Sequence, residues 1–158
     1  MVHLCNFIYI LMYTYIIKFD FTDMLNTLKL LASIENFSKL SDWWQDIATS
    51  WSLSNTLISK INICLEETYV NIASYAYSDK TGTADISIDK NDSEIILKFE
   101  DSGIEYNPLQ KEDPDITLSL DERPIGGLGI FMVKEMSKNI EYKREGNKNI
   151  LILKFDID

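Results

Sequence analysis

The hydrophobic positions in the first part of the chain recur every three to four residues, which is the spacing of a helix with one apolar face. This pattern predicts a helix over residues 34–51 and, before it, a strand over residues 25–32, with Ser33 as the capping residue. The positions that define the helical spacing are Phe37, Leu40, Trp44, Ile47, Ala48 and Trp51.

A second predicted helix begins at Ser54 or Asn55 and runs to about Tyr77. Its apolar residues do not keep to one stripe, because Ile63 and Val70 fall on the side opposite the main core face. A helix that is apolar nearly all round is covered on both sides. Its polar residues must therefore find partners among the groups that cover it.

The second part of the chain alternates apolar and polar residues, which is the period of a strand. Residues 82–90 and 94–101 form a predicted hairpin that turns at residues 91–92. Residues 140–144 and 150–156 form a second predicted hairpin, with a glycine in its turn. The two strands of each hairpin are expected to pair in the antiparallel direction.

Between the two hairpins lie an irregular segment and a short helix. Residues 102–125 contain all three prolines and show no periodicity, and a loop of this length typically serves as a lid or a binding loop. A helix is predicted over residues 130–137. The order of elements predicts an α+β fold, a two-layer sandwich of a mostly antiparallel mixed sheet with helices on one face.

Length, charge and composition narrow the function further. The chain has 158 residues, which fits one domain, and a formal net charge of −10, which argues against nucleic acid as the main partner. We expect no direct contact with nucleic acid. It has a single histidine, His3, which excludes histidine-based zinc sites and Ser/His/Asp triads. Cys5 and Cys64 lie far apart without a CxxC motif, which is typical of a reduced, cytoplasmic protein.

The N-terminal segment contains an apolar run, Leu4–Ile17, of 14 residues. The run is too short for a membrane span and lacks the flanking features of a signal peptide, so we expect no membrane association. An extra strand and a leader from an over-long start assignment remain as alternatives. We therefore divide the chain into an N-terminal extension of unclear role, residues 1–24, and a domain over residues 25–158.

Glu67 and Asn71 stand four residues apart on the second predicted helix and so share one face. One interpretation is a polar patch on a partly exposed helix. The other is a general base beside a magnesium ligand, because hard cations prefer oxygen donors and an amide carbonyl suffices when phosphates complete the shell.

Asp101, Ser102 and Gly103 follow the third predicted strand. These are turn-forming residues, so a plain turn is one interpretation. Alternatively, the carboxylate accepts a hydrogen bond from an exocyclic amine, and the glycine lets a flat base approach the backbone closely.

Gly126, Gly127, Leu128 and Gly129 precede the short helix. Glycines at a helix N-terminus expose successive N–H groups and form an anion site suited to a polyphosphate, whereas a flexible hinge is the alternative. No Lys-Ser/Thr pair follows, so the segment is not a Walker sequence, and no parallel βαβ unit surrounds it.

The three features together, in this order, resemble the GHKL (histidine-kinase-like) ATP-binding fold over about residues 25–156. Within that superfamily the similarity is closest to the anti-sigma-factor serine/threonine protein kinases. The segments that carry it are EETYVNIASYAY, EDSGIEYNP and RPIGGLGIFMVKEM, which look like the N, G1 and G2 boxes of that family.

The resemblance implies a role for each matching residue. Glu67 matches the catalytic carboxylate, Asn71 the Mg²⁺ ligand, and Asp101 the acceptor of the adenine amino group. Other matches lie around the nucleotide: Ser74, Tyr75 and Gly103 at the pocket, Arg123 in the lid, and Gly127, Leu128 and Gly129 at the phosphates. The chain departs from the family at Tyr106, where Phe is common, and at residues 147–149, where Asn147-Lys148-Asn149 stand in place of the usual Gly-Thr. Asn149 is the residue that would lie on the adenine side.

By the same resemblance the chain binds Mg-ATP and phosphorylates a serine of an antagonist protein, thereby regulating a sigma factor. An alternative from another class is a nucleotide-sensing module that sequesters a protein partner without phosphotransfer, and a third is a structural domain without nucleotide. We expect a homodimer, because relatives dimerise. Residues 104–125 carry six acidic and two basic residues, so we expect this lid to be mobile until Mg-ATP orders it.

Overall fold

The computed structural model describes residues 26–78, 81–110, 114 and 128–157. The predicted N-terminal extension and most of the predicted lid lie outside these ranges, so the expectations for them stay predictions. In the described ranges no helix is both long and apolar enough to cross a membrane.

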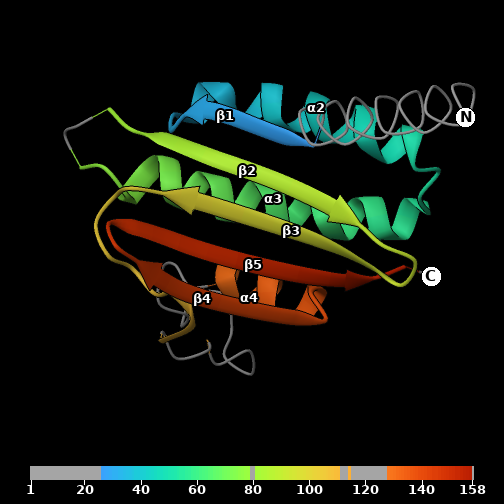
Figure 1. Ribbon diagram of the computed structural model, residues 1–158. Coiled ribbons are helices and arrows are strands. Elements are labelled where there is room, and N and C mark those ends of the chain that lie inside the picture. Colours follow the sequence, from blue (N-terminus) through green and yellow to red (C-terminus); the bar gives the residue numbers. More distant parts are fainter. Residues whose placement is uncertain (1–25, 79–80, 111–113, 115–127, 158) are drawn as a thin grey trace, which may run out of the picture.

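One five-stranded sheet forms the front layer of the molecule (Figure 1). Its strand order is β1-β2-β3-β5-β4, and each of the four pairings between described strands is antiparallel. The predicted α+β class is confirmed, and the sheet is antiparallel throughout these residues rather than mixed. The strands are β1 (Thr27–Leu31), β2 (Thr83–Lys90), β3 (Glu94–Asp101), β4 (Asn139–Glu145) and β5 (Lys148–Asp156).

The helices lie on one face of this sheet, as predicted, and none of the described helices lies on the other face (Figure 1). Helix α3 lies between α2 and α4 in the helical layer and contacts both. This arrangement explains why its apolar residues extend beyond one stripe. The helical segments are η1 (Ile34–Asn36), α2 (Phe37–Ser50), α3 (Asn55–Tyr75), η2 (Pro108–Gln110) and α4 (Leu128–Met136).

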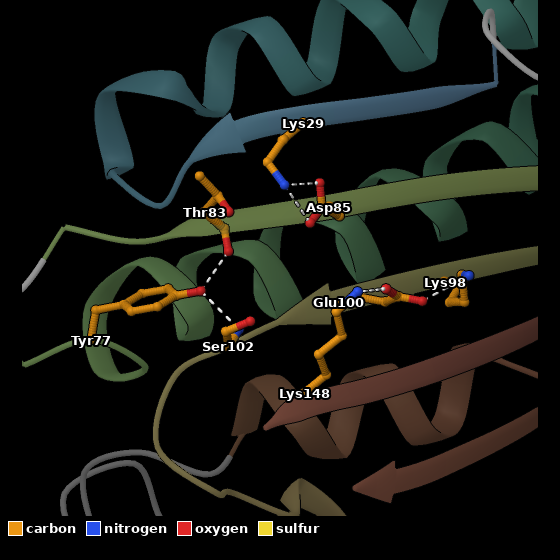
Figure 2. Close-up of polar contacts among 8 residues, drawn as sticks. All are labelled: Lys29, Tyr77, Thr83, Asp85, Lys98, Glu100, Ser102 and Lys148. Carbon is orange, nitrogen blue, oxygen red and sulfur yellow. Dashed lines mark hydrogen bonds and ion pairs between the residues drawn. The ribbon is translucent and has the colours of Figure 1, made fainter. Parts of the chain in front are cut away.

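Alternation along each strand divides the sheet into an apolar inner face and a charged outer face. On β3, Ile95, Leu97 and Phe99 are almost fully buried against the helices. Between them, Lys98 and Glu100 point outward, and Glu100 forms ion pairs with Lys98 and with Lys148 of β5 (Figure 2). The core therefore lies between the sheet and the helices, and α3 runs through its centre.

Two local features fix the position of α3. The side-chain oxygen of Ser54 accepts a hydrogen bond from the backbone N–H of Leu57 at 3.3 Å, so the predicted start of the helix is confirmed. In the middle of the helix, the buried Tyr69 donates its hydroxyl to the carbonyl oxygens of Leu31 (2.8 Å) and Ser33 (3.0 Å). These contacts tie α3 to the end of the edge strand β1.

Both predicted hairpins are present. In the first, the Asn91 side chain accepts hydrogen bonds from the backbone N–H groups of Ser93 and Glu94, both at 2.9 Å, which closes the turn. In the second, Gly146 adopts a φ of 56°, a conformation that favours glycine. Each turn therefore forms where the sequence pattern placed it.

The boundaries of three predicted helices differ from the structure. Residues 34–36 form a 3₁₀ turn before α2, and Ser33 makes no side-chain cap. Helix α3 ends at Tyr75. Helix α4 already includes Leu128, the first described residue of this segment, so Gly129 lies inside the helix instead of in the preceding loop.

Candidate functional site

A cavity of about 670 Å³ opens between α3, the first turn of α4 and the inner face of the sheet. Its lining includes residues from each of the three motifs that the sequence analysis singled out. The predicted site residues that line it are Glu67, Asn71, Tyr75, Asp101, Leu128, Gly129 and Asn149. Folding thus brings together residues that are more than 80 positions apart in the chain.

Glu67 and Asn71 enter the cavity from one face of α3, as their spacing predicts. The Glu67 carboxylate lies directly against Gly129 in the first turn of α4, where an added Cβ would overlap it. Burial raises the pKa of the Glu67 carboxyl above its ordinary value, and the neighbouring Glu66 carboxylate adds to the rise. A half-buried carboxylate with a raised pKa is a better proton acceptor than an exposed one.

Asp101 ends β3, also lines the cavity and is only 7% exposed. Its Oδ1 accepts hydrogen bonds from the backbone N–H of Gly103 at 2.8 Å and from Nδ2 of Asn149 at 2.9 Å. Both bonds fall on one carboxylate oxygen, so the other oxygen remains available as an acceptor toward the cavity.

Gly103 has a structural role that sequence analysis did not foresee. An added Cβ would overlap the backbone and side chain of Ala76 at the end of α3. The next residue, Ile104, donates its backbone N–H to the Ala76 carbonyl at 2.8 Å. The close approach that requires a glycine is therefore to α3, and Gly103 is not among the residues that line the cavity.

Tyr77, just after α3, holds the same turn from the helix side (Figure 2). Its hydroxyl donates to the carbonyl oxygen of Thr83 at 2.5 Å and accepts from the backbone N–H of Ser102 at 2.9 Å. The ring occupies the space that a Cβ on Gly82 would need. Tyr77 thereby connects the end of α3 to the start of β2 and the end of β3.

The remaining predicted site residues either do not line the cavity or lie outside the described residues. Ser74 is exposed on α3 and is not among the cavity-lining residues. Arg123, Gly126 and Gly127 lie outside the described residues, so the proposed phosphate loop is represented by Leu128 and Gly129 alone.

Several residues at the site escaped the sequence analysis. Thr68 lines the cavity, and its buried hydroxyl has no hydrogen-bond partner among the described residues. Tyr142 lines the cavity from β4, and Arg144 donates from Nη1 to the Gly103 carbonyl at 3.2 Å. The alternation along β4 was a usable signal, because it places Tyr142 and Arg144 on the same face as the half-buried Ile140.

The chemistry of the lining suits a flat apolar ligand with polar groups at both ends. Aromatic and aliphatic side chains form much of the wall, and some remain exposed at its edge, including Tyr75 (69%), Ile104 (58%) and Tyr106 (50%). Asp101 provides an acceptor beside the turn that packs on Ala76 at the end of α3, and Glu67 provides oxygen atoms beside Gly129 of α4. Asn71 adds an amide oxygen one helical turn after Glu67. A purine nucleotide has this distribution of apolar and polar groups.

A divalent cation fits only together with such a ligand. In the described parts of the chain no three His, Cys, Asp or Glu residues cluster in a way that would hold a metal ion. Glu67 and Asn71 supply oxygen donors, the type that Mg²⁺ prefers, but too few for a complete shell. Mg²⁺ usually completes its shell with water and phosphate oxygens, so the donor set matches an ion that arrives with a nucleotide.

Comparison with known proteins finds similar sequences and similar solved structures. The chain is 26% identical over 129 residues to the serine/threonine-protein kinase BtrW of Bordetella bronchiseptica, covering 81% of this chain and 91% of that protein. Among solved structures it is similar to the histidine kinase AdeS of Acinetobacter baumannii, with 20% identity, a TM-score of 0.46, and coverage of 83% of this chain and 68% of that one.

The assignment of the chain to a protein family rests on a match to a family model. The model for the histidine kinase-like ATPase domain matches residues 30–155, which run from the end of β1 to the penultimate residue of β5 and include every predicted site residue. The resemblance inferred from the three motifs is thereby confirmed at the level of the family. The chain belongs to the histidine kinase-like ATPase domain family.

Proposed function

We propose that this protein is an ATP-dependent serine/threonine protein kinase of the anti-sigma-factor type, which phosphorylates a serine of an antagonist protein. The observation that carries the proposal is the placement of Glu67 and Asn71 in one cavity with Asp101, and of the Glu67 carboxylate against Gly129 at the start of α4. The name of the relative BtrW, a serine/threonine-protein kinase, supports the same class of reaction.

Each of these residues has a defined task in the proposed reaction. The Asp101 carboxylate accepts a hydrogen bond from the exocyclic amine of adenine and thereby orients the nucleotide. At the other end, Glu67 accepts the proton of the serine hydroxyl as its oxygen bonds to the γ-phosphorus and the bond to the ADP oxygen breaks. The N-terminal turn of α4 directs its backbone dipoles at the phosphates, a favourable site for their negative charge.

Asn71 is the residue that would hold Mg²⁺ on the cavity side of α3. The bound ion would neutralise phosphate charge during transfer. This assignment explains why an amide, which is neutral, stands one helical turn from the carboxylate of Glu67. A second carboxylate at position 71 would raise the pKa of Glu67 further and reduce its ionised fraction.

The proposed partners are an antagonist protein that carries the acceptor serine and a sigma factor that this chain binds when the antagonist is absent. The net charge of −10 favours protein partners with basic or neutral surfaces over direct contact with nucleic acid. We further propose that the protein acts as a homodimer in the cytoplasm.

The test is transfer of the γ-phosphate from ATP to a purified antagonist-type protein. We expect Glu67→Gln to slow transfer by about 10²–10⁴-fold, because the amide cannot accept the hydroxyl proton. Binding of ATP should change little, because the substitution keeps the size of the side chain. Glu66→Gln is the matched control, since Glu66 is the adjacent carboxylate, is exposed, and does not line the cavity. It should slow transfer only slightly, because it removes the smaller of the two causes that raise the pKa of Glu67.

Two results would contradict the proposal in different ways. Equal transfer rates for Glu67→Gln and the wild type would show that another group is the base. Tight ATP binding by the wild type without transfer to any antagonist-type protein would favour the nucleotide-sensing module instead.

A further inference from the structure

A compact hydrogen-bond network surrounds Asn149 at the start of β5, next to Asp101 on the neighbouring strand β3. Asn149 is 7% exposed, and its Oδ1 accepts three hydrogen bonds. The Tyr142 hydroxyl and Nη1 of Arg144 each donate at 2.8 Å, and the backbone N–H of Tyr106 donates at 3.3 Å. An amide oxygen has two lone pairs, so its acceptor capacity is fully used.

The nitrogen of the same amide faces acceptors only. Nδ2 of Asn149 donates to Oδ1 of Asp101 at 2.9 Å and to the carbonyl oxygen of Ile104 at 2.8 Å. Because donors surround one side of the amide and acceptors the other, only one of its two flipped orientations satisfies the network. Asn149 is therefore fixed as a hydrogen-bond donor to Asp101.

The sheet register explains why these groups meet. Asp101 of β3 pairs with Asn149 of β5, and Asn149 pairs with Arg144 of β4. The three residues therefore lie side by side in one row across the sheet, on its inner face. The row runs from a guanidinium through an amide to a carboxylate, an order in which each group complements its neighbour.

This order has an electrostatic consequence. The positive charge of Arg144 lies at the oxygen of the Asn149 amide and polarises it, so that the N–H bonds become stronger donors. The hydrogen bond to the Asp101 carboxylate is charge-assisted and gains most from this polarisation. One oxygen of Asp101 is thus engaged, and the carboxylate plane is fixed relative to the cavity.

We propose that Arg144 and Tyr142 are positioning residues that act through Asn149 to orient the Asp101 carboxylate and so determine selectivity for a 6-amino purine over a 6-oxo purine. The inference rests on the proposed function, because it requires the purine to bind at Asp101. A carboxylate is an acceptor only, so it attracts an exocyclic amine and repels a 6-oxo group held at the same point. The repulsion is large only if the carboxylate cannot rotate away.

The experiment compares the dissociation constants of ATP and ITP, which differ at purine position 6, by calorimetry at constant Mg²⁺. For the wild type we expect ATP to bind on the order of 100-fold more tightly than ITP. Arg144→Met and Tyr142→Phe should each reduce this ratio by about tenfold, because each removes a strong hydrogen bond from the Asn149 oxygen. The matched control is Lys143→Met, which removes a positive charge from the same strand on the exposed outer face.

The outcomes separate a positioning role from a structural one. If both variants weaken ATP and ITP binding equally, the ratio is unchanged and the inference is overturned. If the wild type binds neither nucleotide, the proposed function fails, and the inference fails with it for that separate reason. Tyr142→Phe keeps the shape of the ring, so it decides the question even if Arg144→Met does not fold.

Discussion

Cys64 shows how a single side chain can report on the packing of α3. It lies one turn before Thr68 and is completely buried in the core. Burial, with a smaller contribution from the Glu67 carboxylate, raises the pKa of the thiol to about 12. At neutral and mildly basic pH the group therefore stays protonated and behaves as a small apolar side chain.

This pKa predicts low reactivity of Cys64 toward thiol reagents in the folded state. In a Cys5→Ser variant at pH 8.5, we expect modification to be on the order of a thousand-fold slower than in denaturant, because only the thiolate reacts and little of it forms when the pKa is raised. The rate should rise with pH, as the thiolate fraction does. Rapid modification of the folded protein at pH 8.5 would contradict the burial of this residue.

At the scale of elements, the turn after β3 is held from two sides. From the helical layer, Tyr77 bonds to Ser102 and Gly103 packs on Ala76. From the sheet, Asn149 bonds to Asp101. The segment that presents the proposed purine acceptor is therefore fixed by the packing of α3 against the sheet, and its geometry depends on both layers.

Tyr77→Phe should measure the contribution of the helix side. The variant removes the hydroxyl that bridges Thr83 and Ser102, so we expect the free energy of unfolding to fall by about 1–2 kcal/mol. Tyr75→Phe is the matched control, because Tyr75 is 69% exposed and should lose little stability. Equal denaturation midpoints for the two variants would show that the bridge contributes nothing.

At the scale of the whole molecule, the cavity connects α3, α4 and the sheet, so a ligand that fills it should stabilise the complete fold. At a Mg-ATP concentration of 100 times the dissociation constant, linkage predicts about 2.7 kcal/mol of stabilisation. For a chain of this length we expect the melting temperature to rise by roughly 5–10 °C. Differential scanning fluorimetry measures the shift directly.

The variant Asp101→Asn should reduce this shift at equal nucleotide concentration, because the amide loses the charge that strengthens the hydrogen bond to the adenine amine. Asp85→Asn should not reduce it, because Asp85 lies on the outer face of β2 in an ion pair with Lys29 (Figure 2). A wild-type melting temperature unaffected by Mg-ATP would contradict nucleotide binding in this cavity.

Local sequence patterns predicted the helices, the strands and the two hairpins to within a few residues, because apolar periodicity and turn residues act over neighbouring positions. It also indicated Glu67, Asn71 and Asp101, whose side-chain chemistry and order along the chain resemble a known family. The place of Gly129 inside α4 was harder to predict, since glycines are compatible with both a loop and a helical turn.

Which residues from distant parts of the chain come into contact could not be predicted from local patterns. The pairing of β3 with β5 and of β5 with β4 brings Asp101, Asn149 and Arg144 into one row, and no local pattern encodes that strand order. The true reason for Gly103 likewise depends on the end of α3, which packs against it from outside the turn. Contacts between elements arise from how their apolar faces are buried together, so they appear only when the whole core forms.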